Sequence, residues 1–171
     1  YSNRGYLFSQ KRQFELAIQD YTKAINLGSQ TAYIYNARAF AYSMKYDYEA
    51  ALIDISKAIS IDPSPDGYYL NRGYYYTNLG KYELAIADYK TCLEKNPANT
   101  FAYINIISPL VRMRKLEEAV SYYDQYKKKK LTSYLESDAY KFYRTYLDAV
   151  VSTSQGKLEE AINNIDLAVG Q

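Results

Sequence analysis

Small apolar residues recur along the chain at a constant interval. Ala17, Ala51, Ala85 and Ala119 follow one another at steps of 34 residues. Neighbouring stretches are imperfect copies of one another at this step, with aromatic, small and polar positions returning in the same order. A fixed period of about 20 to 50 residues predicts stacked supersecondary units, because one unit alone cannot bury its apolar face. The chain is therefore expected to be a repeat protein.

The most regular copy, residues 66–99, predicts two helices joined by a short turn. Apolar residues follow one another at three- and four-residue spacing through its first half, up to Gly80, which is expected to end the first helix. A second helix is predicted over about residues 81–95, because Pro97 follows and cannot continue it. Small residues such as Gly73 are expected where the two helices approach closely. Each copy is thus expected to be a helical hairpin.

The period divides the chain into five repeats, of which the first is truncated and the last two are degenerate. The repeats span residues 1–31, 32–65, 66–99, 100–133 and 134–171. In repeats one and two, helices are predicted at residues 1–10, 13–27, 31–44 and 48–61. We expect the five repeats to form one all-helical domain.

Repeats four and five depart from the pattern. Pro109 lies inside the first helix of repeat four and should kink that helix or delay its start. The four lysines at residues 127–130 are expected to close the second helix, where cations suit the negative end of the dipole, with an anion site as the alternative. The next step of the period is eight residues longer. A capping box then predicts one long helix over about residues 134–154, followed by a helix over residues 157–169.

The central copy carries the signature of a repeat family. The signature is an aromatic residue, Gly or Ala four residues on, an aromatic, Gly, Ala, an aromatic, Ala and Pro at set offsets. The matching positions are Tyr69, Gly73, Tyr76, Gly80, Ala85, Tyr89, Cys92 (where Ala is usual) and Pro97. In these residues the chain resembles the tetratricopeptide repeat family, which implies a right-handed α-solenoid of antiparallel helix-turn-helix repeats. Tyr1 corresponds to Tyr69 and so stands three residues after the start of its repeat, and the chain does not begin with Met. We therefore expect the sequence to be a piece of a longer protein.

Each of the first three repeats carries an arginine where the family often has Leu, and an aspartate sixteen residues later. The residues are Arg4 and Asp20, Arg38 and Asp54, and Arg72 and Asp88. Repeat four replaces both members together, with Ile106 and Tyr122. A half-buried charge without a partner costs about several kcal/mol, so the joint loss predicts that the two residues pair between the helices of one hairpin. The alternative is that both positions are independently solvated.

Composition narrows the function classes. The formal net charge of +2 is too small to indicate nucleic acid or an anionic membrane as a partner. No apolar run is long enough for a transmembrane helix and Tyr1 opens directly into a repeat, so neither a membrane span nor a signal peptide is expected. The location of the parent protein stays open. Because the chain has no histidine and its single cysteine, Cys92, falls on a small buried position, no enzyme, metal site or cofactor is expected.

The resemblance implies that a partner is held in the concave groove formed by the first helices. The family's groove-facing positions correspond here to Tyr6, Tyr33, Asn36, Phe40, Leu70, Asn71, Tyr74, Asn78, Phe101 and Asn105. Amides hydrogen-bond a peptide backbone and aromatic rings take its side chains, so an extended or helical peptide of a partner protein is the expected ligand. The alternative is that several of these rings fill space between neighbouring repeats.

Chaperone-binding members of the family clamp a terminal carboxylate with Lys and Arg in this groove. The first helices of repeats two and three contain no Lys, so that clamp is not expected here. A self-associating structural scaffold or spacer remains the alternative to a peptide-binding adaptor, and a homo-oligomer would be its consequence.

Overall fold

The structure is a computed structural model that describes residues 1–128 together with residues 145, 148, 149 and 152. It divides into two compact units, unit 1 over Tyr1–Ala98 and unit 2 over Asn99–Gln171. Within the described ranges the regular elements are α-helices and no strand occurs, which confirms the expected all-helical fold.

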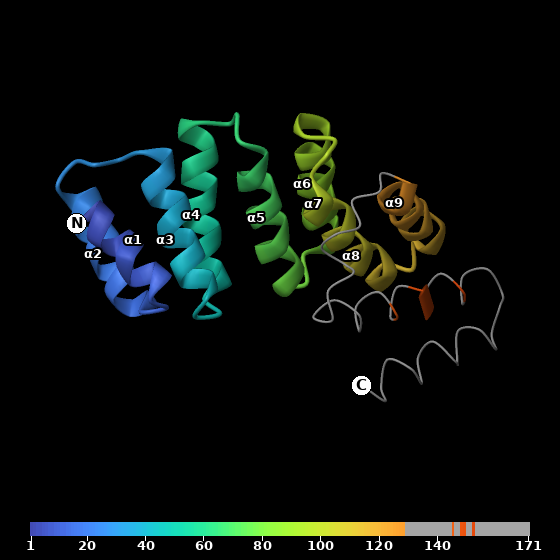
Figure 1. Cartoon of the computed structure of the whole chain (residues 1–171), viewed down its shortest axis with the longest axis horizontal. Coiled ribbons are helices and arrows are strands. Elements are labelled where there is room, and N and C mark those ends of the chain that lie inside the picture. The colour runs from blue at the N-terminus through green and yellow to red at the C-terminus, as the bar shows by residue number, and fades with distance from the viewer. Residues whose placement is uncertain (129–144, 146–147, 150–151, 153–171) are drawn as a thin grey trace. The chain divides into compact units, whose positions relative to one another are not determined.

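Unit 1 consists of three helical hairpins that follow one another along the chain. Its helices are α1 (Ser2–Gln10), α2 (Phe14–Asn26), α3 (Ala32–Ser43), α4 (Tyr48–Ile61), α5 (Asp66–Asn78) and α6 (Tyr82–Lys95). The two helices of each hairpin pack on each other, and successive hairpins meet through α2 with α3 and α4 with α5. Figure 1 shows the three hairpins side by side in chain order. They are the hairpins predicted for repeats one to three, and α4 has the predicted bounds.

Side-chain caps and prolines set the ends of the central helices. Oγ1 of Thr31 accepts a hydrogen bond from the backbone N–H of Ile34, and Oδ1 of Asp47 accepts one from the N–H of Ala50, so α3 and α4 both begin at a polar cap. Pro63 lies in the non-helical connection between α4 and α5, where its missing N–H prevents a continued helix. Local sequence therefore separates one hairpin from the next.

The turn inside each hairpin places one residue in the left-handed backbone region. These residues are Arg12, Tyr46, Gly80 and, in unit 2, Arg114, with φ of 58°, 63°, 72° and 57°. They stand 34 residues apart, so the turn geometry repeats although the residue type does not. Glycine adopts this conformation freely, whereas other residues pay a steric penalty of roughly 1–2 kcal/mol.

In repeats one and three, the two helices of the hairpin lie close together where a glycine faces a tyrosine. A Cβ added to Gly5 would lie 2.9 Å from the Tyr21 ring, and one added to Gly73 would lie 2.8 Å from the Tyr89 ring. Repeat two has Ala39 at the glycine position and a smaller partner, Ile55, both fully buried. A larger residue at the glycine position is therefore accompanied by a smaller residue at the tyrosine position, as the close packing of protein interiors requires.

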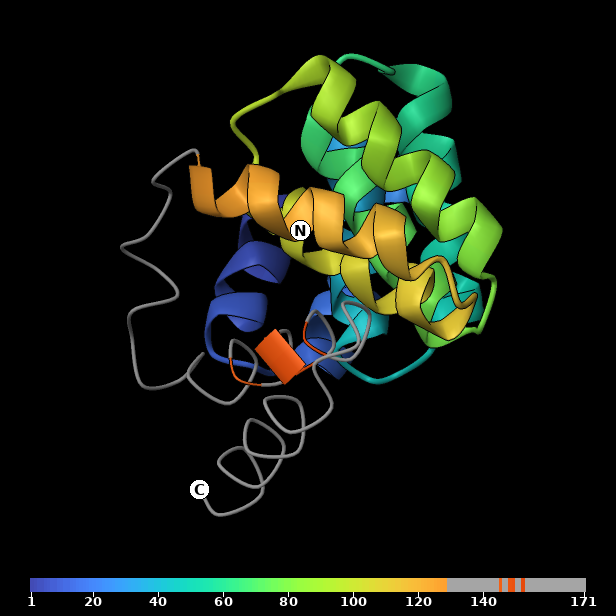
Figure 2. The same cartoon turned by 90° about the vertical axis from the view of Figure 1, so that its right-hand side faces the viewer.

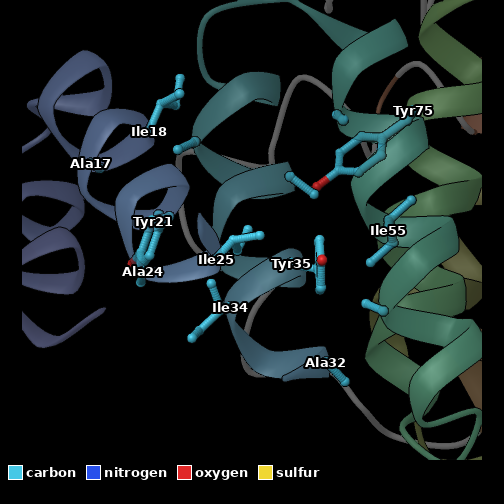
Figure 3. Close-up of a cluster of buried hydrophobic side chains, with 14 residues drawn as sticks. Ala17, Ile18, Tyr21, Ala24, Ile25, Ala32, Ile34, Tyr35, Ile55 and Tyr75 are labelled. Atoms are coloured by element: carbon cyan, nitrogen blue, oxygen red, sulfur yellow. The ribbon is translucent and has the colours of Figure 1, made fainter. Parts of the chain in front are cut away.

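The core of unit 1 runs along the stack of hairpins. Figure 3 shows Tyr35 of α3 and Ile55 of α4 facing the same space, with Tyr75 of α5 reaching back toward repeat two. Tyr21 of α2 is the repeat-one residue that corresponds to Ile55, and it is 1% exposed. Burial raises the pKa of the Tyr75 hydroxyl to about 12, and its interaction with Ser43 opposes this shift. Each hairpin thus completes its apolar packing with side chains of the next.

Unit 2 contains the degenerate repeat four. Its described helices are α7 (Thr100–Asn105), α8 (Ile107–Arg112) and α9 (Leu116–Lys128). Pro109 has no N–H to bond the carbonyl of Asn105, and the first helix of repeat four is interrupted directly after Asn105 instead of starting late. Ile107 also occupies the glycine position opposite Tyr123, and both side chains are buried. In Figure 2, α9 (orange) crosses in front of α7 and α8 (yellow), which it contacts.

Most of the sequence predicted to form repeat five lies outside the described residues. This holds for the predicted helix at 157–169 and for most of the long helix at 134–154. The four described residues between 145 and 152 are helical. One of them, Asp148, accepts a 2.5 Å hydrogen bond from the Tyr123 hydroxyl of α9. Lys127 and Lys128 lie in the last described turn of α9, and the other two lysines of that run lie outside the described residues.

Candidate functional site

The exposed side chains of α1, α3 and α5 form a surface that we call the first-helix face. Its aromatic members are Tyr6, Tyr33, Phe40 and Tyr74, which are between 44% and 51% exposed. Leu70, Asn36 and Asn71 are half-buried on the same helices, and Asn78 at the end of α5 is exposed. Eight of the ten predicted site residues therefore lie on the first helices of unit 1. Phe101 and Asn105 lie on α7 in unit 2, where Phe101 is 43% exposed.

Two rings of the face pack edge-to-face against the preceding repeat. Phe40 meets Phe14 at a centroid distance of 6.3 Å and an interplanar angle of 79°. Tyr74 meets Tyr48 at 6.1 Å and 76°. Edge-to-face contacts at this distance are favourable for aromatic rings. The same two rings therefore fill space between repeats and keep nearly half of their surface exposed.

The second ring of each pair was not among the predicted site residues. Phe14 and Tyr48 are the first residues of α2 and α4, and Tyr82 begins α6 at the same step. The signal that identifies them is an aromatic residue returning every 34 positions at the start of the second helix. Since each ring supports the exposed ring of the next repeat, Phe14 and Tyr48 fix the orientation of Phe40 and Tyr74.

Two asparagines of the face are joined by a hydrogen bond. Nδ2 of Asn71 in α5 donates to Oδ1 of Asn36 in α3 over 3.0 Å, which links repeats two and three. A side-chain amide can donate two hydrogen bonds and accept two. The bond therefore leaves the amide NH₂ group of Asn36 and the carbonyl oxygen of Asn71 able to bind another group. The pair holds both amides in place.

The predicted ion pairs are present in all three hairpins of unit 1. Arg4 Nε lies 2.6 Å from Asp20 Oδ2, Arg38 Nε lies 2.6 Å from Asp54 Oδ2, and Arg72 Nη2 lies 2.7 Å from Asp88 Oδ1. Each arginine donates a second hydrogen bond to the other oxygen of its aspartate, so the pairs are bidentate. These contacts raise the pKa of all three arginines, with the hydrogen bond to the aspartate as the largest cause.

The ion pairs leave the first-helix face without free charge. Helices α1, α3 and α5 contain four charged residues, namely the three paired arginines and Asp66. The Asp66 carboxylate accepts a 2.9 Å hydrogen bond from Nδ2 of Asn96. Exposed charges such as Glu15, Lys57 and Glu83 lie on the second helices instead. The first-helix face therefore offers rings and amides but no free cation for an acidic ligand.

The remaining candidate chemistry in the described residues is structural. Cys92 is fully buried at the small position of α6, and burial is the main reason that the pKa of its thiol rises to about 12. Its Sγ lies 3.9 Å from Oδ2 of Asp66. No group of three or more metal-ligating side chains occurs in the part of the chain that the structure describes. Among those same residues, no helix has the length and apolar character needed to span a membrane.

Comparison with protein families agrees with the hairpins. Family models described as Tetratricopeptide repeat match residues 1–29, 32–65 and 68–99, which are more than half of the chain. The chain belongs to the tetratricopeptide repeat family. The matched ranges correspond to the three hairpins of unit 1. A search of curated proteins gave no match.

Solved structures resemble the chain over different lengths. YrrB, described as a TPR protein with an unusual peptide-binding site, has a TM-score of 0.76 and 24% identity, covering 99% of this chain and 84% of its own. MamA has a TM-score of 0.81 and 16% identity, and the match covers 99% of this chain and 95% of MamA. Both show likeness of fold. The second TPR domain of human RPAP3 was solved in complex with the HSP70 peptide SGPTIEEVD. It has a TM-score of 0.60 and 33% identity, and the match covers 63% of this chain and 89% of that domain.

Proposed function

We propose that the first-helix face binds a peptide segment of a partner protein and that the chain acts as an adaptor without catalytic activity. The observation that carries this proposal is the linked pair of Asn36 and Asn71, each about one helical turn before an exposed ring, Phe40 on α3 and Tyr74 on α5. Amide groups with unused hydrogen-bonding capacity suit a peptide backbone, and rigid aromatic rings suit its side chains.

The composition of the face also distinguishes it from an ordinary solvated surface. Exposed helix surfaces usually carry charged side chains, whereas the first helices of unit 1 carry none that is unpaired. Exposed aromatic residues grouped on one face are typical of interaction sites. RPAP3 is similar in sequence and binds an HSP70 peptide, which supports a peptide as the ligand class. The acidic end of that peptide has no free cation to meet on this face.

Binding assays with matched variants test the proposal. Asn71→Ala and Tyr74→Ala should each weaken a peptide partner captured by the chain, Asn71→Ala by about 1–3 kcal/mol because a bound backbone group loses its partner. Asn71→Ala should alter thermal unfolding little, whereas Tyr74→Ala also removes the edge-to-face contact with Tyr48, so its binding is measured at a temperature at which the variant is folded. Ile53→Ala is the control, since Ile53 is exposed on the second helix of repeat two and lies outside the face. A partner that tolerates Asn71→Ala with Tyr74→Ala but is lost with Ile53→Ala would contradict the proposal.

A further inference from the structure

We propose that the segment bound by the first-helix face is proline-rich and takes the polyproline II conformation. This inference rests on the proposed function, because it names the chemistry of the ligand for the same face. Three properties of the face carry it: the absence of free charge, the regular spacing of its rings, and the small number of hydrogen-bonding groups that it offers to a backbone.

The charge of the face excludes an acidic ligand. Arg4, Arg38 and Arg72 each bind their own aspartate through two hydrogen bonds, so none is free to clamp a carboxylate. Moving a carboxylate from water onto a surface without a cation costs solvation free energy, and no ion pair on that surface offsets the cost. An uncharged segment loses no such solvation, and proline is uncharged.

The exposed rings are arranged at one position per repeat. Phe40 and Tyr74 are 34 residues apart, and each is held by a ring of the preceding repeat in nearly the same geometry, at 79° and 76°. The helices α3 and α5 that carry them are in contact, so their axes are separated by roughly 10 Å. One turn of polyproline II advances about 9.3 Å over three residues. A polyproline II segment can therefore place one proline ring against each aromatic ring.

An α-helix or a β-strand can also present side chains roughly 10 Å apart, so the spacing does not distinguish them from polyproline II. Backbone hydrogen bonding decides between these three peptide conformations. An α-helix bonds its own backbone and would leave the NH₂ group of Asn36 unused. A strand brings an N–H group at each residue, the carbonyl oxygen of Asn71 can accept from only a few of these, and the helical backbones of α3 and α5 have no free edge to supply more acceptors. A proline-rich segment has free carbonyl groups and few N–H groups, so the NH₂ group of Asn36 and the carbonyl oxygen of Asn71 can satisfy it.

Titration with three peptides tests this inference. The probes are a blocked octaproline, a blocked neutral peptide that forms an amphipathic helix, and SGPTIEEVD with a free carboxylate, each added to the 171-residue chain and followed by calorimetry. Octaproline should bind more tightly than the other two. Phe40→Ala and Tyr74→Ala should each weaken octaproline by about tenfold or more, because aromatic anchors dominate such sites, while Ile53→Ala should leave its affinity within about twofold.

A fourth variant isolates the amide group. Asn36→Asp keeps an oxygen that accepts the hydrogen bond from Asn71 but has no N–H to donate to a peptide carbonyl. Because octaproline is neutral, the added charge has no opposite charge to act on, and binding should weaken by about fivefold to tenfold. Circular dichroism should show an unchanged fold.

The possible outcomes separate this inference from the proposed function. If octaproline does not bind while either other peptide binds and is lost with Asn71→Ala and Tyr74→Ala, the inference is wrong and the proposed function stands. If octaproline binds with an affinity that Phe40→Ala and Tyr74→Ala leave unchanged, the face is not its site and the inference is wrong. If no peptide or partner binding depends on the first-helix face, both the inference and the proposed function are wrong.

Discussion

Gly73 lies directly against the ring of Tyr89, so close that a Cβ on Gly73 would stand 2.8 Å from Cε1 of the tyrosine. Cβ atoms in proteins do not approach other heavy atoms so closely, and Tyr89 is fully buried with no free space to move into. The glycine therefore sets the distance between α5 and α6.

Gly73→Ala should lower the free energy of unfolding by about 1–3 kcal/mol, because the added methyl group overpacks a closed interface. The double variant Gly73→Ala with Tyr89→Ile should recover part of the loss, since it copies the pair of Ala39 and Ile55 found in repeat two. Urea unfolding of the two variants measures both effects. A double variant no more stable than Gly73→Ala alone would show that the close approach does not limit stability.

Breaking the central ion pair should be more costly than breaking the first one. Asp54→Ala should lower the free energy of unfolding by about 3–5 kcal/mol, because Arg38 is then left half-buried without its partner. Asp20→Ala should cost clearly less, since the Arg4 side chain is 60% exposed and regains water. Urea unfolding of the two variants at the same ionic strength compares their losses in unfolding free energy. Equal losses would mean that burial of the arginine does not determine the cost.

The sequence predicts contacts inside a repeat better than contacts between repeats. Arg38 and Asp54 could be paired from the sequence because their spacing recurs and both are lost together in repeat four. The bond between Asn71 and Asn36 spans 35 residues, one more than the period, and so joins positions that do not align. Its existence depends on the offset with which neighbouring hairpins stack, and the period does not contain that information.

The pair of Arg4 and Asp20 should make the stability of unit 1 depend on pH in the acid range. Hydrogen bonds from Arg4 are the main reason that the pKa of the Asp20 carboxyl is below its ordinary value in the folded state. A carboxyl with a lowered folded-state pKa stabilises the fold above its unfolded pKa, and this stability is lost as the pH falls through the folded-state pKa. Asp20→Asn should therefore flatten the decline in unfolding free energy below about pH 4. Urea titrations at several pH values measure this slope, and an unchanged slope would contradict the assignment.

Replacing the buried cysteine should have little effect. Cys92→Ala should change the free energy of unfolding by about 1 kcal/mol, because Ala24 and Ala58 already occupy the equivalent positions. Asp66 keeps its hydrogen bond from Asn96 in this variant. Since burial raises the thiol pKa to about 12, the native protein should also react slowly with thiol reagents at neutral pH. Fast labelling of the folded protein, or a large loss of melting temperature, would show that the thiol has a further role.

The hairpin turn of repeat two should be more stable with glycine than with its own tyrosine. Tyr46 has φ of 63° and is 80% exposed, so it bears the steric cost of the left-handed conformation while burying little of its ring. Tyr46→Gly should raise the free energy of unfolding by about 0.5–1 kcal/mol, after the greater unfolded-state entropy of glycine and the lost contact with Tyr48 are subtracted. Gly80→Ala is the matched control, since it places a side chain at the same turn position of repeat three and should destabilise by about 1 kcal/mol. Thermal and urea unfolding measure both variants. If Tyr46→Gly is destabilising while Gly80→Ala behaves as expected, the ring of Tyr46 contributes more through its contact with Tyr48 than the backbone strain removes.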